Sequence, residues 1–123
     1  YKKTASNDLI IDAYNANPTS MSAALDNFKG MVADSKVVIL GDMKELGHVS
    51  EAEHQKIADM LPALHLKQAF LIGPEFAKTT ADALKFDSVD QLNEYLKANP
   101  ITSSLVLVKG SNSMKLTSCV DNL

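Results

Sequence analysis

Four short apolar runs, none of which alternates with polar residues, constrain the fold of this chain most strongly. They are residues 9–11 (LII), 36–40 (KVVIL), 68–72 (QAFLI) and 105–108 (LVLV). Continuously apolar strands are buried on both faces, as in a parallel sheet covered by helices. Helical patterns fill the intervals between the runs, and this alternation is typical of doubly wound α/β domains. The sequence therefore predicts one Rossmann-like domain over residues 1–123, with a mostly parallel sheet and helices on both faces.

Mainly apolar residues recur at helical spacing between these runs and after the last of them. The recurring residues are Met21, Leu25, Phe28 and Val32; Ile57, Leu61 and Leu64; Phe76, Thr80 and Leu84; Val89, Leu92 and Leu96; and Leu116, Val120 and Leu123. Thr19 or Ser20 could cap the first helix, and the Ser-x-x-Glu and Ser-x-x-Gln sequences beginning at Ser50 and Ser88 predict capping boxes. Residues 85–86 predict a minimal further strand.

The composition excludes several classes of function. Twelve basic residues, all lysine, are outnumbered by fifteen acidic residues, which gives a formal net charge of -3. The chain therefore lacks the positive surface that nucleic-acid binding needs, and it has no guanidinium for bidentate capture of a phosphate. Cys119, the one cysteine, cannot form an internal disulfide and is expected to be a packing thiol. His48, His54 and His65 lack the i, i+4 spacing of a helical zinc site, so we expect no metal centre and place them at surface or capping positions.

The hydropathy of the chain and its first residues predict the cellular compartment. No apolar run approaches the roughly 20 residues that a membrane-spanning helix needs. The residues after Tyr1 are polar and do not form the core of a signal peptide. We therefore expect a cytoplasmic protein without membrane insertion and, because the chain lacks an initiator methionine, a fragment of a longer polypeptide.

Polar segments follow each predicted strand, at residues 12–20, 41–48, 73–74 and 109–113, and the last three contain glycine. In a parallel sheet these segments meet at the carboxyl edge, where doubly wound folds bind ligands. Asp12 is placed to contact a ribose hydroxyl or a metal, while Asn15 and Asn17 offer both donors and acceptors. The same residue types also end strands and cap turns, so the residues alone leave a structural role equally open.

Lys109, Gly110 and Ser111 superficially look like part of a phosphate-binding loop. Their order is Lys-Gly-Ser, whereas a P-loop requires Gly-Lys-Ser/Thr after an earlier glycine. Lys109 could still hold a carboxylate or phosphate as a point charge. No nucleophile, base and acid can be assembled from the chain, so we predict no catalytic residue.

Three segments together carry a specific resemblance. Residues 12–21 (DAYNANPTSM), 40–47 (LGDMKELG) and 108–111 (VKGS), in this order, resemble the carboxyl-terminal domain of Mur ligases of the MurF type. The resemblance covers essentially the whole chain. It implies an ATP-dependent ligase of peptidoglycan synthesis, in which ATP phosphorylates the carboxylate of UDP-N-acetylmuramoyl-tripeptide and the amine of D-Ala-D-Ala attacks the acyl phosphate.

The resemblance also implies roles for particular residues. Expected nucleotide contacts are Asp12, Tyr14, Asn15 and Asn17, with Asp12 on the ribose hydroxyls; expected contacts for D-Ala-D-Ala are Asp42, Met43, Lys109, Ser111 and Asn112. In the family an amino-terminal domain holds the UDP-sugar, and a central ATPase domain of the same polypeptide holds the P-loop, Mg and most of the ATP. The chain alone is therefore expected neither to hydrolyse ATP nor to ligate.

The chain departs from the family at two points. Many relatives have an arginine where this chain has Asn112, and a nucleotide-contacting arginine of the preceding linker has no counterpart here. A stand-alone nucleotide-binding or receiver-like regulatory module is the alternative function. A receiver needs an acceptor aspartate after its third strand, where this chain has Gly73.

Overall fold

The computed structural model describes residues 1–12 and 15–123. Within them, six strands form one sheet in the order β1-β2-β6-β3-β4-β5. Their bounds are Lys2–Lys3 (β1), Asp8–Asp12 (β2), Lys36–Gly41 (β3), Gln68–Ile72 (β4), Leu84–Phe86 (β5) and Leu105–Lys109 (β6). The short β1 is antiparallel to β2, and every other pairing is parallel, as the apolar runs predict.

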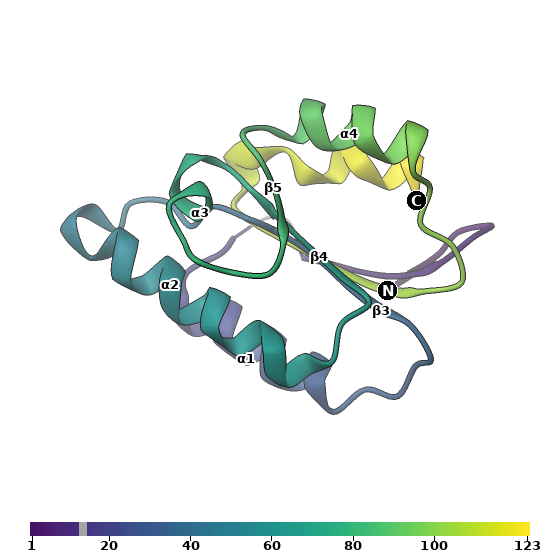
Figure 1. The fold of residues 1–123 in the computed structure, drawn as a ribbon, viewed down its shortest axis with the longest axis horizontal. Coiled ribbons are helices and arrows are strands. Elements are labelled where there is room, and N and C mark those ends of the chain that lie inside the picture. Colours follow the sequence, from purple (N-terminus) through teal and green to yellow (C-terminus); the bar gives the residue numbers. More distant parts are fainter. Residues whose placement is uncertain (13–14) are drawn as a thin grey trace.

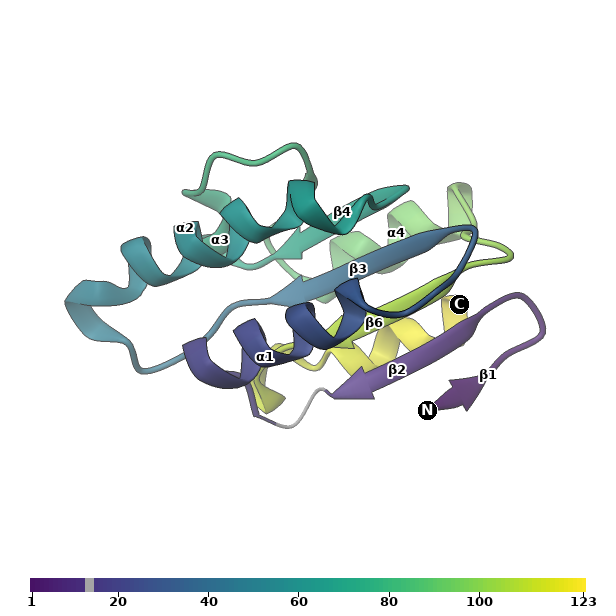
Figure 2. The same ribbon diagram turned by 90° about the horizontal axis from the view of Figure 1, so that it is seen from below.

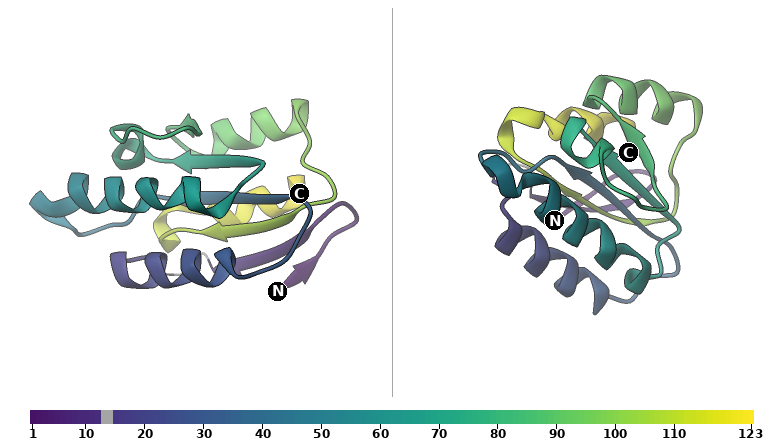
Figure 3. Two further views of the ribbon diagram at one scale, coloured as in Figure 1. Left: turned by 60° about the horizontal axis from the view of Figure 1, so that its bottom comes forward. Right: turned by 60° about the vertical axis from the view of Figure 1, so that its left-hand side comes forward.

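Helices cover both faces of this sheet. Helices α1 (Pro18–Lys29) and α2 (Ser50–Met60) lie on one face, and α4 (Val89–Ala98) lies on the other beside the 3-10 segment Leu116–Asn122 (Figure 1). Figure 3 shows the same two layers from other directions. The four-residue helix α3 (Pro74–Ala77) follows β4 directly. The prediction of a doubly wound α/β domain is confirmed.

Strand β3 shows why these runs are apolar throughout. All six of its residues are buried. Val38 and Leu40 join the core beneath α1 and α2, whereas Val37 and Ile39 join the core beneath α4. Successive side chains from Val37 to Leu40 thus enter opposite cores, so none of these four positions faces solvent.

The first helix differs from the sequence prediction at both ends. Asn17 is its N-cap: Asn17 Oδ1 accepts from the Ser20 amide at 2.8 Å, and Ser20 Oγ accepts from the Asn17 amide at 3.1 Å. The helix ends at Lys29, and Val32 is 99% exposed, so its place in the buried stripe was wrong. Lys36 Nζ donates to the carbonyl of Phe28 at 2.9 Å, which also accepts from the Met31 amide, so this last-turn carbonyl has two donors.

The other helix starts and lengths also depend on contacts across the fold. A capping box at Ser50 does not form, because a 3-10 turn leads into α2 and Ser50 Oγ donates to Glu75 instead. Ser88 does cap α4, at 3.4 Å from the Gln91 amide. The predicted third helix is limited to α3, and Leu84 belongs to β5.

Cys119 lies in the core beneath α4, as expected for a packing thiol. Burial raises the pKa of its thiol to about 12. Because the thiolate is the reactive form, we expect no reaction with a disulfide reagent in the native protein at pH 8 and complete reaction in denaturant. Absorbance of the released thiolate measures both, and fast native labelling would contradict the buried position.

Candidate functional site

The carboxyl ends of the parallel strands gather the polar segments at one edge. Asp12 on β2 is in register with Lys109 on β6, and Gly41 on β3 is in register with Ile72 on β4. Figure 2 shows the arrowheads of β2, β3 and β4 pointing the same way. The expected meeting of these segments at one edge is confirmed.

Lys109 and Asp12 form an ion pair at this edge. Lys109 Nζ lies 2.6 Å from Asp12 Oδ2 and 3.3 Å from the carbonyl oxygen of Asn15. The lysine side chain is 1% exposed, whereas that of Asp12 is 54% exposed. The ammonium therefore ties the segment after β2 to the end of β6, and it is the carboxylate that faces solvent.

The other residues predicted to contact nucleotide differ in whether their side chains are already engaged within the domain. Asn15 is exposed. Asn17 is also exposed, but its side-chain oxygen is engaged as the cap of α1. Tyr14 lies outside the described residues.

Asp42, at the start of the segment after β3, is fully buried. Its Oδ2 accepts from the Glu75 amide and its Oδ1 from the Phe76 amide, both at 2.9 Å. These are free amides of the first turn of α3, so Asp42 holds α3 against the end of β3. Gly73, just before α3, has φ 121°, and a Cβ there would lie 2.3 Å from Asp42 Cγ.

Met43 is also buried, packed in the core beneath α1 and α2. The chain becomes exposed at Lys44 and Glu45, and Glu45 has a left-handed backbone with φ 62°. We call residues 42–47 the acceptor loop. This loop, Ser50, Pro74 and Glu75 line a hollow of about 370 Å³.

His54 is fully buried beneath the acceptor loop, so its predicted surface position was wrong; His48 and His65 are exposed. Its Nε2 accepts from the Met43 amide at 3.0 Å, and its Nδ1 lies 2.7 Å from the carbonyl oxygen of Ser50. The ring therefore carries its proton on Nδ1. Helical spacing could have predicted the burial of His54, because it shares one buried face of α2 with Ser50, Ile57 and Ala58.

Ser50, His54 and Asp42 do not form a catalytic triad. His54 Nε2 accepts an amide hydrogen bond and lies 3.9 Å from Asp42 Oδ1. The Ser50 hydroxyl donates to Glu75 Oε1 at 2.5 Å. That hydrogen bond, with one from Lys78, holds the pKa of Glu75 below its usual value.

The glycine of the Lys-Gly-Ser sequence is required by packing. A Cβ on Gly110 would lie 2.6 Å from Leu116 Cδ1 and 3.1 Å from Gly41 Cα. Beyond it, Ser111 is half-buried and Asn112 is exposed. Ser111 and Asn112 are therefore accessible on the loop that follows β6.

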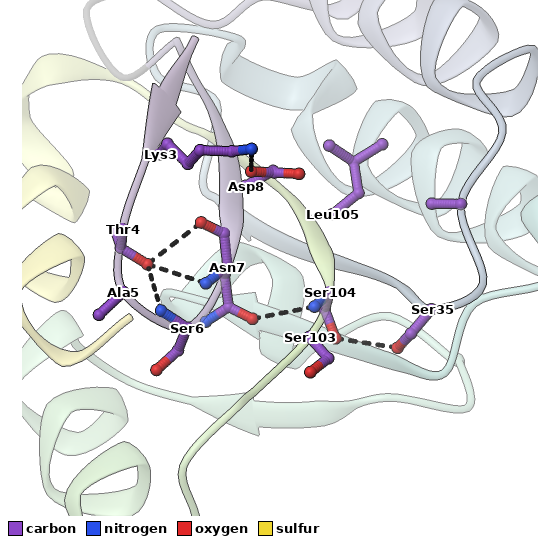
Figure 4. Close-up of a pocket in the computed structure, with 11 residues that line it drawn as sticks. Lys3, Thr4, Ala5, Ser6, Asn7, Asp8, Ser35, Ser103, Ser104 and Leu105 are labelled. Carbon is purple, nitrogen blue, oxygen red and sulfur yellow. Dashed lines mark hydrogen bonds and ion pairs between the residues drawn. The ribbon is translucent and has the colours of Figure 1, made fainter.

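A polar hollow of about 490 Å³ lies at the opposite, amino edge of the sheet (Figure 4). Its lining groups bind one another: the Ser104 amide donates to Asn7 Oδ1, and the Ser35 and Ser104 hydroxyls lie 2.9 Å apart.

Residues 1–12 and 15–123 contain no group of three His, Cys, Asp or Glu that could hold a metal. None of the described helices is long and apolar enough to cross a membrane.

Comparison with known proteins decides the family. Residues 1–112 match the family model described as Mur ligase, glutamate ligase domain. The chain belongs to the Mur ligase family. This Mur ligase domain is 36% identical over 121 residues to the UDP-N-acetylmuramoyl-tripeptide–D-alanyl-D-alanine ligase of Treponema pallidum and 33% identical over 125 residues to that of Bacillus subtilis. These matches cover 91% and 94% of the chain but only 26% and 27% of the relatives, about a quarter of their length.

Solved structures agree with this assignment. A MurF from Acinetobacter baumannii, 26% identical, matches 99% of the Mur ligase domain and 28% of that protein with a TM-score of 0.75. The MurF ligase from Thermotoga maritima in complex with ADP matches 98% of the chain and 29% of that protein with a TM-score of 0.82; at 21% identity it supports the fold alone. The predicted resemblance to a MurF-type carboxyl-terminal domain is confirmed.

Proposed function

We propose that this chain is the carboxyl-terminal domain of an ATP-dependent ligase that joins D-Ala-D-Ala to UDP-N-acetylmuramoyl-tripeptide. The observation that carries the proposal is identity of 33 to 36% over more than nine-tenths of the chain to relatives named for that reaction. Because the chain spans about a quarter of those relatives, the remaining machinery belongs to other domains of the polypeptide. The central ATPase domain would be the direct partner of this one.

Asp12, Asn15 and Asn17 are the proposed nucleotide contacts. The Asp12 carboxylate is half exposed, and a groove of about 790 Å³ between α1 and β2 adjoins it. A carboxylate at this edge suits a ribose diol, which donates two hydrogen bonds. Tyr14 stays a proposed contact by family resemblance alone. Mg and the phosphates of ATP are assigned to the central domain by family resemblance.

Ser111 and Asn112, with the acceptor loop, are the proposed contacts for D-Ala-D-Ala. Asp42 and Met43 are both buried, so they would contribute by supporting the exposed residues of the acceptor loop. Lys109 would act by holding Asp12, since its own ammonium is covered. Closing this edge over the central domain would bring the dipeptide amine to the acyl phosphate and exclude water, so the contribution is positioning.

The reaction itself is tested in the full-length ligase that contains this chain. We expect ADP release that requires UDP-N-acetylmuramoyl-tripeptide and D-Ala-D-Ala together, and none from residues 1–123 alone. Turnover with a single amino acid such as D-alanine or glutamate in place of the dipeptide would reassign the substrate. Turnover by the isolated domain would overturn the proposed division of labour.

Asn112 tests the dipeptide contact. In the full-length ligase, Asn112→Asp places a negative charge beside the proposed position of the dipeptide, which is itself a carboxylate. The KM for D-Ala-D-Ala should therefore rise about tenfold, a loss of about 1.4 kcal/mol. The KM for ATP should stay unchanged. Ser103→Asp is the matched control, because it adds the same charge at an exposed position on the amino edge. Equal effects of the two variants would remove Asn112 from the site.

A further inference from the structure

The loop that follows β3 at this edge depends on one buried imidazole, that of His54. The segment after β3 is anchored twice: Asp42 binds the amides of α3, and the Met43 amide donates to His54. The chain emerges into solvent one residue later, at Lys44. The direction in which the acceptor loop leaves the core is thus set at Met43.

The hydrogen bond at Met43 requires an unprotonated Nε2. His54 has no freedom to exchange the roles of its two nitrogens, because Nδ1 faces the carbonyl oxygen of Ser50 at 2.7 Å and must donate. The Phe76 ring packs nearly perpendicular to the imidazole, with centroids 4.7 Å apart, and limits rotation of the imidazole. A second proton on Nε2 would oppose the Met43 N–H and break the anchor.

The charged groups around the ring come from two other elements. From the loop after β3, Asp42 Oδ1 lies 3.9 Å from Nε2. From α3, Glu75 reaches the ring through the Ser50 hydroxyl, and Lys78 in turn pairs with Glu75 at 3.1 Å. Two carboxylates thus lie near the ring, one of them reached through the Ser50 hydroxyl.

We propose that His54 is a positioning residue, which fixes the acceptor loop for the dipeptide through the Met43 amide and releases the loop when its ring is protonated. The effect on dipeptide binding rests on the proposed function, whereas the anchoring of the loop by His54 does not. The neutral ring holds the loop in place, so the KM for D-Ala-D-Ala should rise as pH falls.

Two substitutions of His54 distinguish the role of Nε2 from that of Nδ1. Gln at this position can present an oxygen near the place of Nε2 and accept from Met43, whereas Asn can reach only the place of Nδ1. Hydrogen exchange of residues 1–123 should show Met43 protection reduced at least about tenfold in His54→Asn and retained in His54→Gln. In the wild type, ¹⁵N spectra should show a protonated Nδ1 and an unprotonated Nε2.

The functional half is measured in the full-length ligase. His54→Asn should raise the KM for D-Ala-D-Ala about tenfold with the KM for UDP-N-acetylmuramoyl-tripeptide unchanged, and His54→Gln should stay within about twofold of wild type. The rise of this KM at low pH should disappear in His54→Gln, which has no titrating group at this position.

Each failure has a different meaning. Unchanged Met43 protection in His54→Asn would overturn the anchor itself. Lost protection with an unchanged dipeptide KM would overturn the positioning role while the ligase function stands. A wild-type ligase that does not use D-Ala-D-Ala would overturn the proposed function and leave the hydrogen-exchange result intact. If His54→Asn does not fold, survival of the low-pH rise in His54→Gln still refutes the proposal.

Discussion

Replacing Gly73 by alanine is expected to lower the free energy of unfolding by about 3 kcal/mol or more. Its φ of 121° is a backbone conformation that residues with a Cβ rarely adopt, and the added carbon would lie 2.3 Å from Asp42 Cγ. The Asp42 carboxylate must then leave the amides of Glu75 and Phe76, so strain and loss of the cap of α3 add together. Urea unfolding followed by circular dichroism measures the change.

Gly47 provides the matched control. It also has a left-handed backbone, with φ 58°, but no atom lies within 4 Å of the place where its Cβ would be. Gly47→Ala should therefore cost only about 1 kcal/mol, from the backbone alone. Equal losses in the two variants would show that the contact with Asp42 is unimportant.

The second large effect is an asymmetry within the Asp12–Lys109 pair. Asp12→Ala should destabilise the domain by about 2–3 kcal/mol, because it leaves a buried ammonium with only the Asn15 carbonyl, 3.3 Å away. Lys109→Met should cost less than about 1 kcal/mol, since methionine fills the buried space and the half-exposed carboxylate keeps its water. The double variant should recover most of the loss caused by Asp12→Ala.

A double-mutant cycle in urea measures this coupling. Additive losses, or equal costs for the two single variants, would contradict the burial difference between the partners. In the full-length ligase both single variants should raise the KM for ATP, because each frees the segment that carries the proposed nucleotide contacts. Stability and nucleotide affinity should therefore respond differently to Lys109→Met.

The sheet and the edge at which the polar segments meet could be predicted from the sequence because both depend on local patterns. The runs at 36–40 and 68–72 are buried on two faces, which only a covered parallel sheet provides, and parallel strands align their carboxyl ends. Helix α4 follows for the same reason: its cap at Ser88 and its buried stripe lie within ten residues.

The features that were missed depend on partners distant in the sequence. His54 is buried because it binds an amide 11 residues earlier, and Asp42 reaches amides 33 and 34 residues later. Helix α1 ends before Val32, where Lys36 Nζ meets its last carbonyls. Local capping and periodicity rules do not include such contacts, so they predicted a surface histidine and a longer helix.

Leu116, which lies on the face opposite α1 and α2, belongs to no proposed contact. Its side chain nevertheless occupies the space that a Cβ on either Gly41 or Gly110 would need, one at the end of β3 and the other just after β6. The 3-10 segment that contains Leu116 thus packs directly against the chain where the loops after β3 and β6 begin, so a change in this segment would displace both loops. Random mutagenesis of such a ligase should return loss-of-affinity variants in the terminal 3-10 segment, and a map based on distance to substrate would classify them as remote.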